Sequence, residues 1–310
     1  SFAPFNFTII NFIIFPFFFY LLVYINKKSK AVYRKKPYKK NLFIFGMAFG
    51  FGFYLIGISW ITNSLTFDEN FKVFIPFALI LIPLFLSLFV GLVTLFIGPY
   101  LKLDFPSLIL FSASFAFSDY LRAIIFTGFP WNLWAYSTSS FNELLQIINQ
   151  IGLYSYNLFV ISIFSFPIIL FFKISKIQKL FCITITFLIV LSLFIYGNYK
   201  VNKNRNVIEN ANEKIYVKII SPNFDLKYGL NSKEIEERFK KLIRYSDPVK
   251  NKKTLFIWPE GVFSGYSYDQ ISIFRELILK NFSNKHYIIF GSNKLDPSSG
   301  YFFNSMLIVN

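Results

Sequence analysis

The sequence predicts a polytopic α-helical membrane domain followed by a smaller α/β domain. Two observations support this prediction. Of the 310 residues, 55% are hydrophobic and 22% are aromatic, whereas soluble domains have about 45–50% apolar residues. The excess lies almost wholly before residue 200, while residues 200–310 alternate short apolar runs with charged amphipathic stretches. The chain therefore has an integral-membrane part and a polar globular part.

Six segments of the first part are apolar and long enough to span a membrane, which needs about 20 residues. They are approximately residues 5–25, 41–63, 73–97, 105–126, 144–172 and 180–196. The fifth is longer than one span needs, so we expect it to begin with an interfacial stretch. We predict a transmembrane domain over residues 1–198.

Basic residues are concentrated in two loops of this part. Eight lie between Lys27 and Lys40, and three more lie between Lys173 and Lys179. The positive-inside rule places both loops in the cytoplasm. Four predicted spans separate the loops, so the two assignments agree, and residues after Tyr196 are expected on the outer side. Because the basic clusters flank apolar spans, the net charge of +16 does not indicate a nucleic-acid partner.

Residues 199–310 are predicted to alternate strands with helices, an order that indicates an α/β layer fold. We expect strands at 214–220, 254–258, 286–292 and 302–309, and helices at 232–245 and 269–282. Ser232 is the N-cap candidate of the first helix. The last strand has nothing after it, so the sheet is expected to be incomplete. Since the sequence starts at Ser1 and stops at Asn310 after an apolar run, we expect both ends to be cut.

Glu260 is the candidate catalytic residue. It stands in Trp258-Pro259-Glu260-Gly261, directly after the apolar run Thr254–Ile257. A carboxylate just past the end of a buried strand lies where α/β folds place their chemistry. From this context alone, a solvated loop carboxylate is an equally good interpretation.

The stretch 128–136, Gly-Phe-Pro-Trp-Asn-Leu-Trp-Ala-Tyr, follows the fourth span. Tryptophan and tyrosine favour the membrane interface, so an anchoring belt is one interpretation. The other is a wall that holds acyl chains beside the outer leaflet, because three large aromatics around a Gly-Pro turn are denser than anchoring requires. Within the fourth span, Asp119 and Arg122 are predicted to form a structural ion pair rather than a substrate contact.

The sequence holds one cysteine and one histidine. This excludes an intramolecular disulfide and a zinc site of familiar spacing, and we expect no cofactor or metal. Cys182 has no neighbouring histidine or carboxylate, so we interpret it as a small apolar filler rather than a nucleophile. His286 precedes a strand in a lysine-rich turn, so we expect it at the surface.

These motifs resemble those of a known family. Leu255-Phe256-Ile257-Trp258-Pro259-Glu260-Gly261 is similar to the strand and catalytic glutamate of the nitrilase superfamily. Together with the spans and with Thr127-Gly128-Phe129-Pro130-Trp131, it resembles bacterial apolipoprotein N-acyltransferase. Further similarities lie at Asp119-Tyr120-Leu121-Arg122, at Ser221-Pro222-Asn223-Phe224, at Gly291-Ser292 and at Phe303-Asn304-Ser305.

The resemblance implies a nitrilase-like αββα sandwich that is incomplete at its C-terminus. In this family a Glu–Lys–Cys triad moves an acyl chain from a phospholipid, through a cysteine thioester, to the α-amino group of a diacylglyceryl-cysteine lipoprotein. Only Glu260, the general base, maps onto this sequence; the lysine and cysteine are expected beyond Asn310, so the fragment should be inactive alone. The substrate-binding residues implied are Gly128, Phe129, Pro130, Trp131, Trp134, Tyr136 and Tyr228. Tyr228 stands where the family has tryptophan.

The implied location is the bacterial inner membrane, with residues 199–310 in the periplasm and the protein a monomer. The implied partners are the bilayer, a phospholipid acyl donor and a diacylglyceryl apolipoprotein acceptor. Two alternatives stay open. A membrane-anchored nitrilase-type amidase would share Glu260 but would not need the aromatic stretch. A non-enzymatic lipid-binding scaffold or transporter is disfavoured because the spans lack internal repeats and midplane charges.

Overall fold

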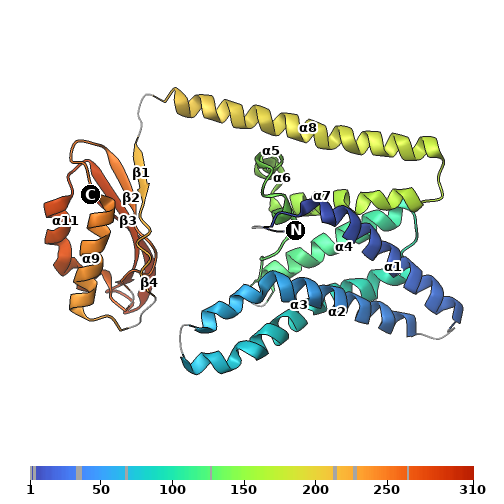
Figure 1. Ribbon diagram of the computed structural model, residues 1–310, viewed down its shortest axis with the longest axis horizontal. Helices are drawn as coiled ribbons and strands as arrows, with labels where there is room; N and C mark the ends of the chain where they lie inside the picture. Colours follow the sequence, from blue (N-terminus) through green and yellow to red (C-terminus); the bar gives the residue numbers. More distant parts are fainter. Residues whose placement is uncertain are drawn as a thin grey trace. The chain divides into compact units, whose positions relative to one another are not determined.

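The computed structural model describes residues 2, 5–32, 37–66, 69–125, 128–211, 215–225, 229–263 and 265–310. The chain divides into two compact units, Ser1–Glu209 and Asn210–Asn310. Figure 1 shows that the first is built of helices and that the second contains the β-sheet. The expected combination of a helical membrane part and a small α/β part is thus confirmed at this level.

Six segments of the described helical unit are long and apolar enough to cross a membrane, the number that the sequence predicts. They are Thr8–Lys28, Lys39–Thr66, Glu69–Tyr100, Phe105–Ile124, Leu153–Phe171 and Lys176–Glu209. Their main helices are α1 (Asn11–Val32), α2 (Pro37–Ile58), α3 (Ile75–Ile97), α4 (Phe105–Ile124), α7 (Leu153–Ser165) and α8 (Lys176–Glu209). Helix α8 continues well past the expected end at Tyr196. The end of an apolar run limits the membrane span and not the helix, and no proline interrupts residues 176–209.

Short elements connect these helices. They are the 3-10 helices η1 (Thr8–Ile10), η2 (Ser59–Thr66), η3 (Glu69–Phe74), η4 (Gly98–Tyr100), η5 (Trp134–Thr138) and η6 (Phe166–Phe171), and the single-turn helices α5 (Asn142–Leu145) and α6 (Ile148–Ile151). The expected fifth segment, 144–172, is therefore not one helix. It is interrupted at Gly152, whose φ is +79°. Glycine adopts this backbone conformation readily, but an α-helix cannot continue through it.

Helices α2 and α3 form an antiparallel pair (Figure 1) that is packed through small residues. A Cβ atom added at Gly46 would lie 2.0 Å from Thr94 Oγ1, and one added at Gly50 would lie 3.0 Å from Val90 Cβ. These glycines form a GxxxG pattern, which lets two backbones approach closely in lipid, where the hydrophobic effect does not drive helix association. Their lack of a side chain therefore sets the distance between α2 and α3.

An aromatic core joins α1 to its neighbours. Phe18 of α1 stacks on Phe49 of α2 with ring centroids 4.0 Å apart. Phe19 meets Phe111 of α4 edge-on at 5.2 Å, and both of these rings are fully buried. Such offset or edge-on pairs add stability beyond the area that they bury.

The second unit is a four-stranded mixed sheet in the order β1–β2–β3–β4. The strands are β1 (Tyr216–Ile219), β2 (Thr254–Ile257), β3 (His286–Leu295) and β4 (Phe302–Val309). The first three are parallel, and β4 is antiparallel to β3. The helices are α9 (Ser232–Ser246), α10 (Tyr268–Ile271) and α11 (Arg275–Asn281), with η7 (Ser272–Phe274) between the last two. The one helix expected at 269–282 is thus three short ones.

The N-cap of α9 is Asn231, not Ser232. The Asn231 side chain accepts a hydrogen bond from the Glu234 backbone N–H at 3.0 Å, and the Glu234 carboxylate accepts one from the Asn231 N–H at 2.9 Å. This reciprocal capping box satisfies two backbone donors at the start of the helix. Because the helix begins one residue earlier than the sequence predicts for its cap, Ser232 is the first helical residue and Asn231 is the N-cap.

The helices cover one face of the sheet. Phe239 of α9 and Phe256 of β2 belong to one buried cluster on that face, and Figure 1 shows α9 and α11 on the same side. Because side chains alternate between faces, the opposite face carries the residues paired in the order Ile219, Ile257, Ile289 and Ile308. We call these four the isoleucine row. Its two ends are 74% and 60% exposed, so this face is apolar and largely open.

Candidate functional site

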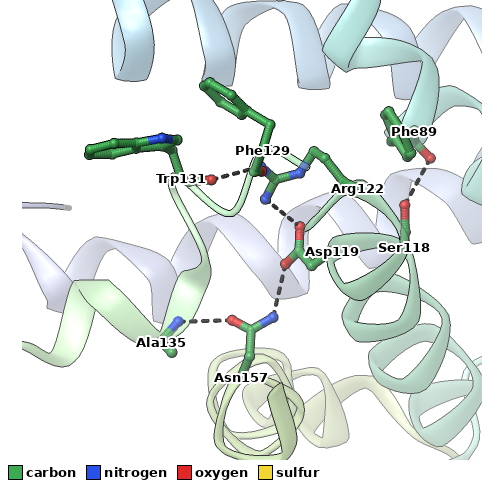
Figure 2. A network of polar contacts seen from close by, with 8 residues as sticks. All are labelled: Phe89, Ser118, Asp119, Arg122, Phe129, Trp131, Ala135 and Asn157. Atoms are coloured by element: carbon green, nitrogen blue, oxygen red, sulfur yellow. Dashed lines mark hydrogen bonds and ion pairs between the residues drawn. The ribbon is translucent and has the colours of Figure 1, made fainter. Parts of the chain in front are cut away.

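A buried ion pair inside α4 organises the polar site of the helical unit. Arg122 Nη2 lies 3.0 Å from Asp119 Oδ1, and the two residues are only 1% and 8% exposed. The structural ion pair expected from the i, i+3 spacing is confirmed (Figure 2). A charge removed from water must be paired and hydrogen-bonded. Arg122 Nη1 and Asp119 Oδ2 hydrogen-bond to the neighbouring loop and helix, whereas the buried Arg122 Nε has no hydrogen-bond partner among the described residues.

The Arg122 side chain hydrogen-bonds to the backbone of the stretch 128–136, which we call the aromatic loop. Its Nη1 donates to the carbonyl oxygens of Phe129 at 2.6 Å and of Trp131 at 2.7 Å. The planar guanidinium presents its donors as a fixed fork, which suits two carbonyls at a set spacing. Gly128 makes this path possible, because its φ is +82° and an added Cβ would lie 2.3 Å from the Ala123 carbonyl oxygen. The loop is thus fixed at its first turn.

Asn157 of α7 completes the network. Its Nδ2 donates to Asp119 Oδ2 at 2.9 Å, and its Oδ1 accepts from the Ala135 N–H at 2.9 Å. We call Asp119, Arg122 and Asn157 the loop clamp; Figure 2 shows how it joins α4, the loop and α7. The sequence interpretation missed Asn157. The available signal was an amide inside an apolar helix, where such groups bond across helices.

The two tryptophans of the stretch 128–136 differ in how far their rings are buried. Trp134 is 7% exposed and packs into the helical core, stacked on Phe53 at 4.4 Å and edge-on to Phe15 at 4.6 Å. It is therefore not part of an exposed wall, because η5 turns its ring inward. Trp131 is 52% exposed and meets Trp60 edge-on at 5.2 Å.

The other residues of the stretch lie between these extremes. Phe129 is partly buried against the helical core, and Pro130 is exposed. Tyr136 is 37% exposed. Partial burial raises the pKa of the Tyr136 hydroxyl above its usual value, and the nearby Tyr154 acts in the same direction. Since tyrosine already titrates near pH 10, this hydroxyl stays a neutral hydrogen-bond donor at neutral pH.

In the second unit, Glu260 lies at the carboxyl edge of the parallel strands. It directly follows the strand end at Trp258-Pro259, is exposed, and precedes Gly261, whose φ is +70°. A Cβ added at Gly291 of β3 would lie 3.6 Å from Glu260 Cγ. Within residues 215–225, 229–263 and 265–310 no hydrogen bond or ion pair engages its carboxylate. The carboxylate is thus available beside β3, at the edge where α/β folds bind their ligands.

Trp258, two residues before Glu260, is buried beneath this edge and is fixed by a hydrogen bond. It is 3% exposed, and its indole Nε1 donates to Ser246 Oγ at 3.0 Å. A buried indole N–H needs such a partner. Because Trp258 is held between β2 and the end of α9, the backbone that leads to Glu260 is fixed.

The structure also places Cys182 and His286, the two other residues that the sequence singles out. Cys182 is partly buried against the helical core. The surface position expected for His286 is wrong: it is 1% exposed, its Nδ1 accepts from the Ser283 N–H at 3.1 Å, and its Nε2 pairs with the Val249 carbonyl at 3.0 Å. Two backbone partners satisfy the ring and allow its burial. Tyr228 and Thr127 lie outside the described residues, and among the described residues no cluster of side chains could hold a metal ion.

Comparison with known proteins identifies the helical unit. A model of the apolipoprotein N-acyltransferase N-terminal domain matches residues 1–166. The chain belongs to this family. The matched residues of the apolipoprotein N-acyltransferase domain contain the whole loop clamp and the stretch 128–136, so the resemblance predicted from the motifs is confirmed. Glu260 lies outside the matched range.

Individual relatives in the family agree. The chain is 25% identical over 268 residues to an apolipoprotein N-acyltransferase of Brucella melitensis, covering 83% of this chain and 48% of the relative. It is 26% identical to one of Agrobacterium fabrum (69% and 40% covered) and 35% identical over 119 residues to one of Rickettsia bellii (38% and 24% covered). The chain spans about half the length, or less, of the curated relatives it matches.

Proposed function

We propose that this chain is part of an enzyme that transfers an acyl chain from a phospholipid to the N-terminal amine of a diacylglyceryl-cysteine lipoprotein. The observation that supports it most strongly is the family match, which includes the clamped aromatic loop. Glu260 adds to it, because its carboxylate is exposed at the carboxyl edge of the sheet with no described partner.

The proposed chemistry has two halves that share one base. Glu260 takes the proton of a cysteine thiol, the sulfur attacks the ester carbonyl of the phospholipid, and a C–S bond forms while the bond to the glycerol oxygen breaks. That oxygen leaves with the proton as a lysophospholipid. The lipoprotein amine then attacks the thioester, a C–N bond forms, the C–S bond breaks, and Glu260 passes the amine proton back to sulfur.

The nucleophile of this scheme is not Cys182. This residue is the one cysteine of the 310-residue sequence; it lies within α8 and packs on the helical core. We propose that the cysteine and a lysine that stabilises the tetrahedral oxyanion come from a part of the protein outside these 310 residues. The chain as given would then have no transferase activity alone.

The open face of the sheet supports the proposed αββα sandwich. Two sheets that pack face to face bury apolar side chains between them, about 10 Å apart. The isoleucine row crosses all four strands on the face opposite to α9. A second sheet against this row would complete a nitrilase-like layer order, with helices outside and two sheets inside.

The proposed setting is the bacterial inner membrane, with residues 199–310 in the periplasm and the protein a monomer. The six candidate spans and the family support a multi-pass membrane protein. The basic loop at Lys27–Lys40 supports a cytoplasmic position for the α1–α2 connection. In this orientation the loop clamp and the start of α1 lie toward the outer leaflet, where both proposed substrates would be.

The test is acyl transfer in proteoliposomes that contain a phospholipid and a diacylglyceryl peptide. A longer protein that carries the proposed cysteine and lysine should form the N-acyl peptide, and the 310-residue chain should not. Changing Glu260 to Gln should lower the rate of the longer protein about 10²–10⁴-fold, as loss of a general base does, while Glu276→Gln serves as the control. Transfer by the 310-residue chain, or full activity of the E260Q variant, would overturn the proposal.

A further inference from the structure

Arg238 of α9 joins two loops at the carboxyl edge of the sheet. Its Nη1 donates to the Val262 carbonyl oxygen at 2.8 Å, and its Nη2 donates to the Asp225 carbonyl oxygen at 2.8 Å. Val262 lies two residues after Glu260, and Asp225 lies in the loop that follows β1. Since both nitrogens belong to one rigid, planar guanidinium, the two carbonyl oxygens are held at a set separation. A single side chain therefore ties the Glu260 loop to a second loop.

The ring of Phe224 holds this guanidinium from another direction. Arg238 Cζ lies 4.8 Å from the centroid of Phe224, which is partly buried against the hydrophobic cluster of the second unit. The negative face of an aromatic ring attracts a cation, so the contact favours the orientation that the two carbonyls require. Lys241 Nζ lies over the same ring at 5.0 Å, but among the described residues it donates no hydrogen bond to either loop.

Glu260 lies midway between two attachments to α9. Two residues before it, Trp258 Nε1 donates to Ser246 Oγ at 3.0 Å, and two residues after it, the Val262 carbonyl accepts from Arg238. Ser246 and Arg238 are eight residues apart on α9, about 12 Å along the helix axis. One attachment would leave the turn free to pivot about it, whereas two attachments fix both the place and the direction of the turn.

The second loop leads toward a residue of interest for the reaction. Asp225 is three residues before Tyr228, one of the substrate-binding residues that the resemblance implies. Tyr228 lies outside the described residues, and Asp225 and Phe224 are the described residues that precede it. Arg238 thus holds the backbone on the approach to this residue and the backbone beyond Glu260.

We propose that Arg238 is a positioning residue for acyl transfer, which sets the distance between Glu260 and the loop that leads to Tyr228. This inference rests on the proposed function, in which Glu260 takes a proton from a cysteine thiol. Such a transfer requires the base to lie within hydrogen-bond reach of the proton, and a displacement of about 1 Å can lower the rate about 10²-fold. Because Arg238 donates to backbone carbonyls, it acts through the two loops and not on a substrate.

The first test measures loop motion in the 310-residue chain and needs no transferase activity. The sequence has one cysteine, so Cys182→Ser allows a nitroxide label at Asp225→Cys in one protein and at Glu260→Cys in another. Adding Arg238→Ala should make the label more mobile at both positions, as measured by electron paramagnetic resonance.

Lys241→Ala is the matched control, because it removes a cation from the same Phe224 ring without removing a hydrogen bond to either loop. It should leave both spectra unchanged. A spectrum that Arg238→Ala changes at only one position or at neither, or equal changes with Lys241→Ala, would overturn the coupling of the two loops.

The second test is acyl transfer by the longer protein. Arg238→Ala should lower kcat about 10²-fold, and added guanidinium ion should restore part of the loss by occupying the vacated position, whereas it would not restore a misfolded protein. Arg238→Lys serves if the alanine variant does not fold. Its single nitrogen cannot reproduce the fork of donors, so kcat should still fall, and guanidinium should not restore it.

The E260Q variant separates this inference from the proposed function. Full activity of E260Q would overturn the proposed function itself. An inactive E260Q together with full kcat in Arg238→Lys, or with a folded Arg238→Ala whose loss guanidinium does not reduce, would overturn only the role of Arg238.

Discussion

Arg122 donates from Nη1 to the carbonyl oxygen of Trp131, nine residues further along the chain, at 2.7 Å. The bond holds the loop backbone, while the Trp131 ring is half-exposed and contacts Trp60. The guanidinium itself is buried and is neutralised by Asp119. The position of the exposed aromatic side chains therefore depends on a charged pair inside α4.

Removing this cation should destabilise the helical unit strongly. Arg122→Leu leaves the Asp119 carboxylate buried without its counter-ion, which typically costs about 3–5 kcal/mol. The double variant Asp119→Leu/Arg122→Leu should lose less, because no unpaired charge remains. The measurement is thermal unfolding in detergent, followed by circular dichroism. A single variant as stable as the parent, or a double variant less stable than both singles, would contradict the role assigned to the pair.

Trp134 and Trp131 should respond differently to truncation. Trp134→Ala removes a buried ring from the core and should lower the free energy of unfolding by about 3–5 kcal/mol. Trp131→Ala removes a half-exposed ring and should change stability by less than about 1 kcal/mol. In the longer protein, the proposed function predicts that Trp131→Ala slows acyl transfer to the peptide. A membrane-anchored amidase would keep its turnover in this variant, so the rate distinguishes the two functions.

The helical spans and the strands were predictable because each depends on a local pattern. Long apolar runs predict the six spans, and the short apolar run Thr254–Ile257 predicts β2. The spacing of Asp119 and Arg122 predicts their ion pair, since i and i+3 share one face of a helix. What these patterns miss depends on contacts between distant segments. Asn157 joins the loop clamp from 38 residues away.

The burial of individual side chains could not be predicted from local sequence patterns either. His286 is buried because the Val249 carbonyl and the Ser283 N–H, from two separate loops, satisfy its ring. Trp134 is buried because η5 turns it toward Phe15 and Phe53. Neither outcome follows from residue type, since histidine and tryptophan are intermediate in their burial preferences.

Two glycines of α2 offer a matched comparison. Gly50→Leu forces a side chain into Val90, where a Cβ alone would lie at 3.0 Å, and overpacking of this kind costs about 1–3 kcal/mol. Gly52→Leu adds the same atoms where a Cβ meets nothing within 4 Å. We expect only the first variant to lose stability in thermal unfolding. Equal losses at both positions would show that the α2–α3 contact does not depend on Gly50.

We expect a charge in the isoleucine row to affect stability differently in the 310-residue chain and in a longer protein. In the 310-residue chain, Ile219 is 74% exposed, so Ile219→Lys should leave the free energy of unfolding nearly unchanged and should reduce self-association and the binding of an apolar dye. In a longer protein that completes the proposed sandwich, the same lysine would be buried between two sheets without a partner and should destabilise it by several kcal/mol. Val249→Lys, at a side chain 57% exposed outside the row, is the control and should change little in either protein. Equal tolerance of Ile219→Lys in both would argue against a second sheet on this face.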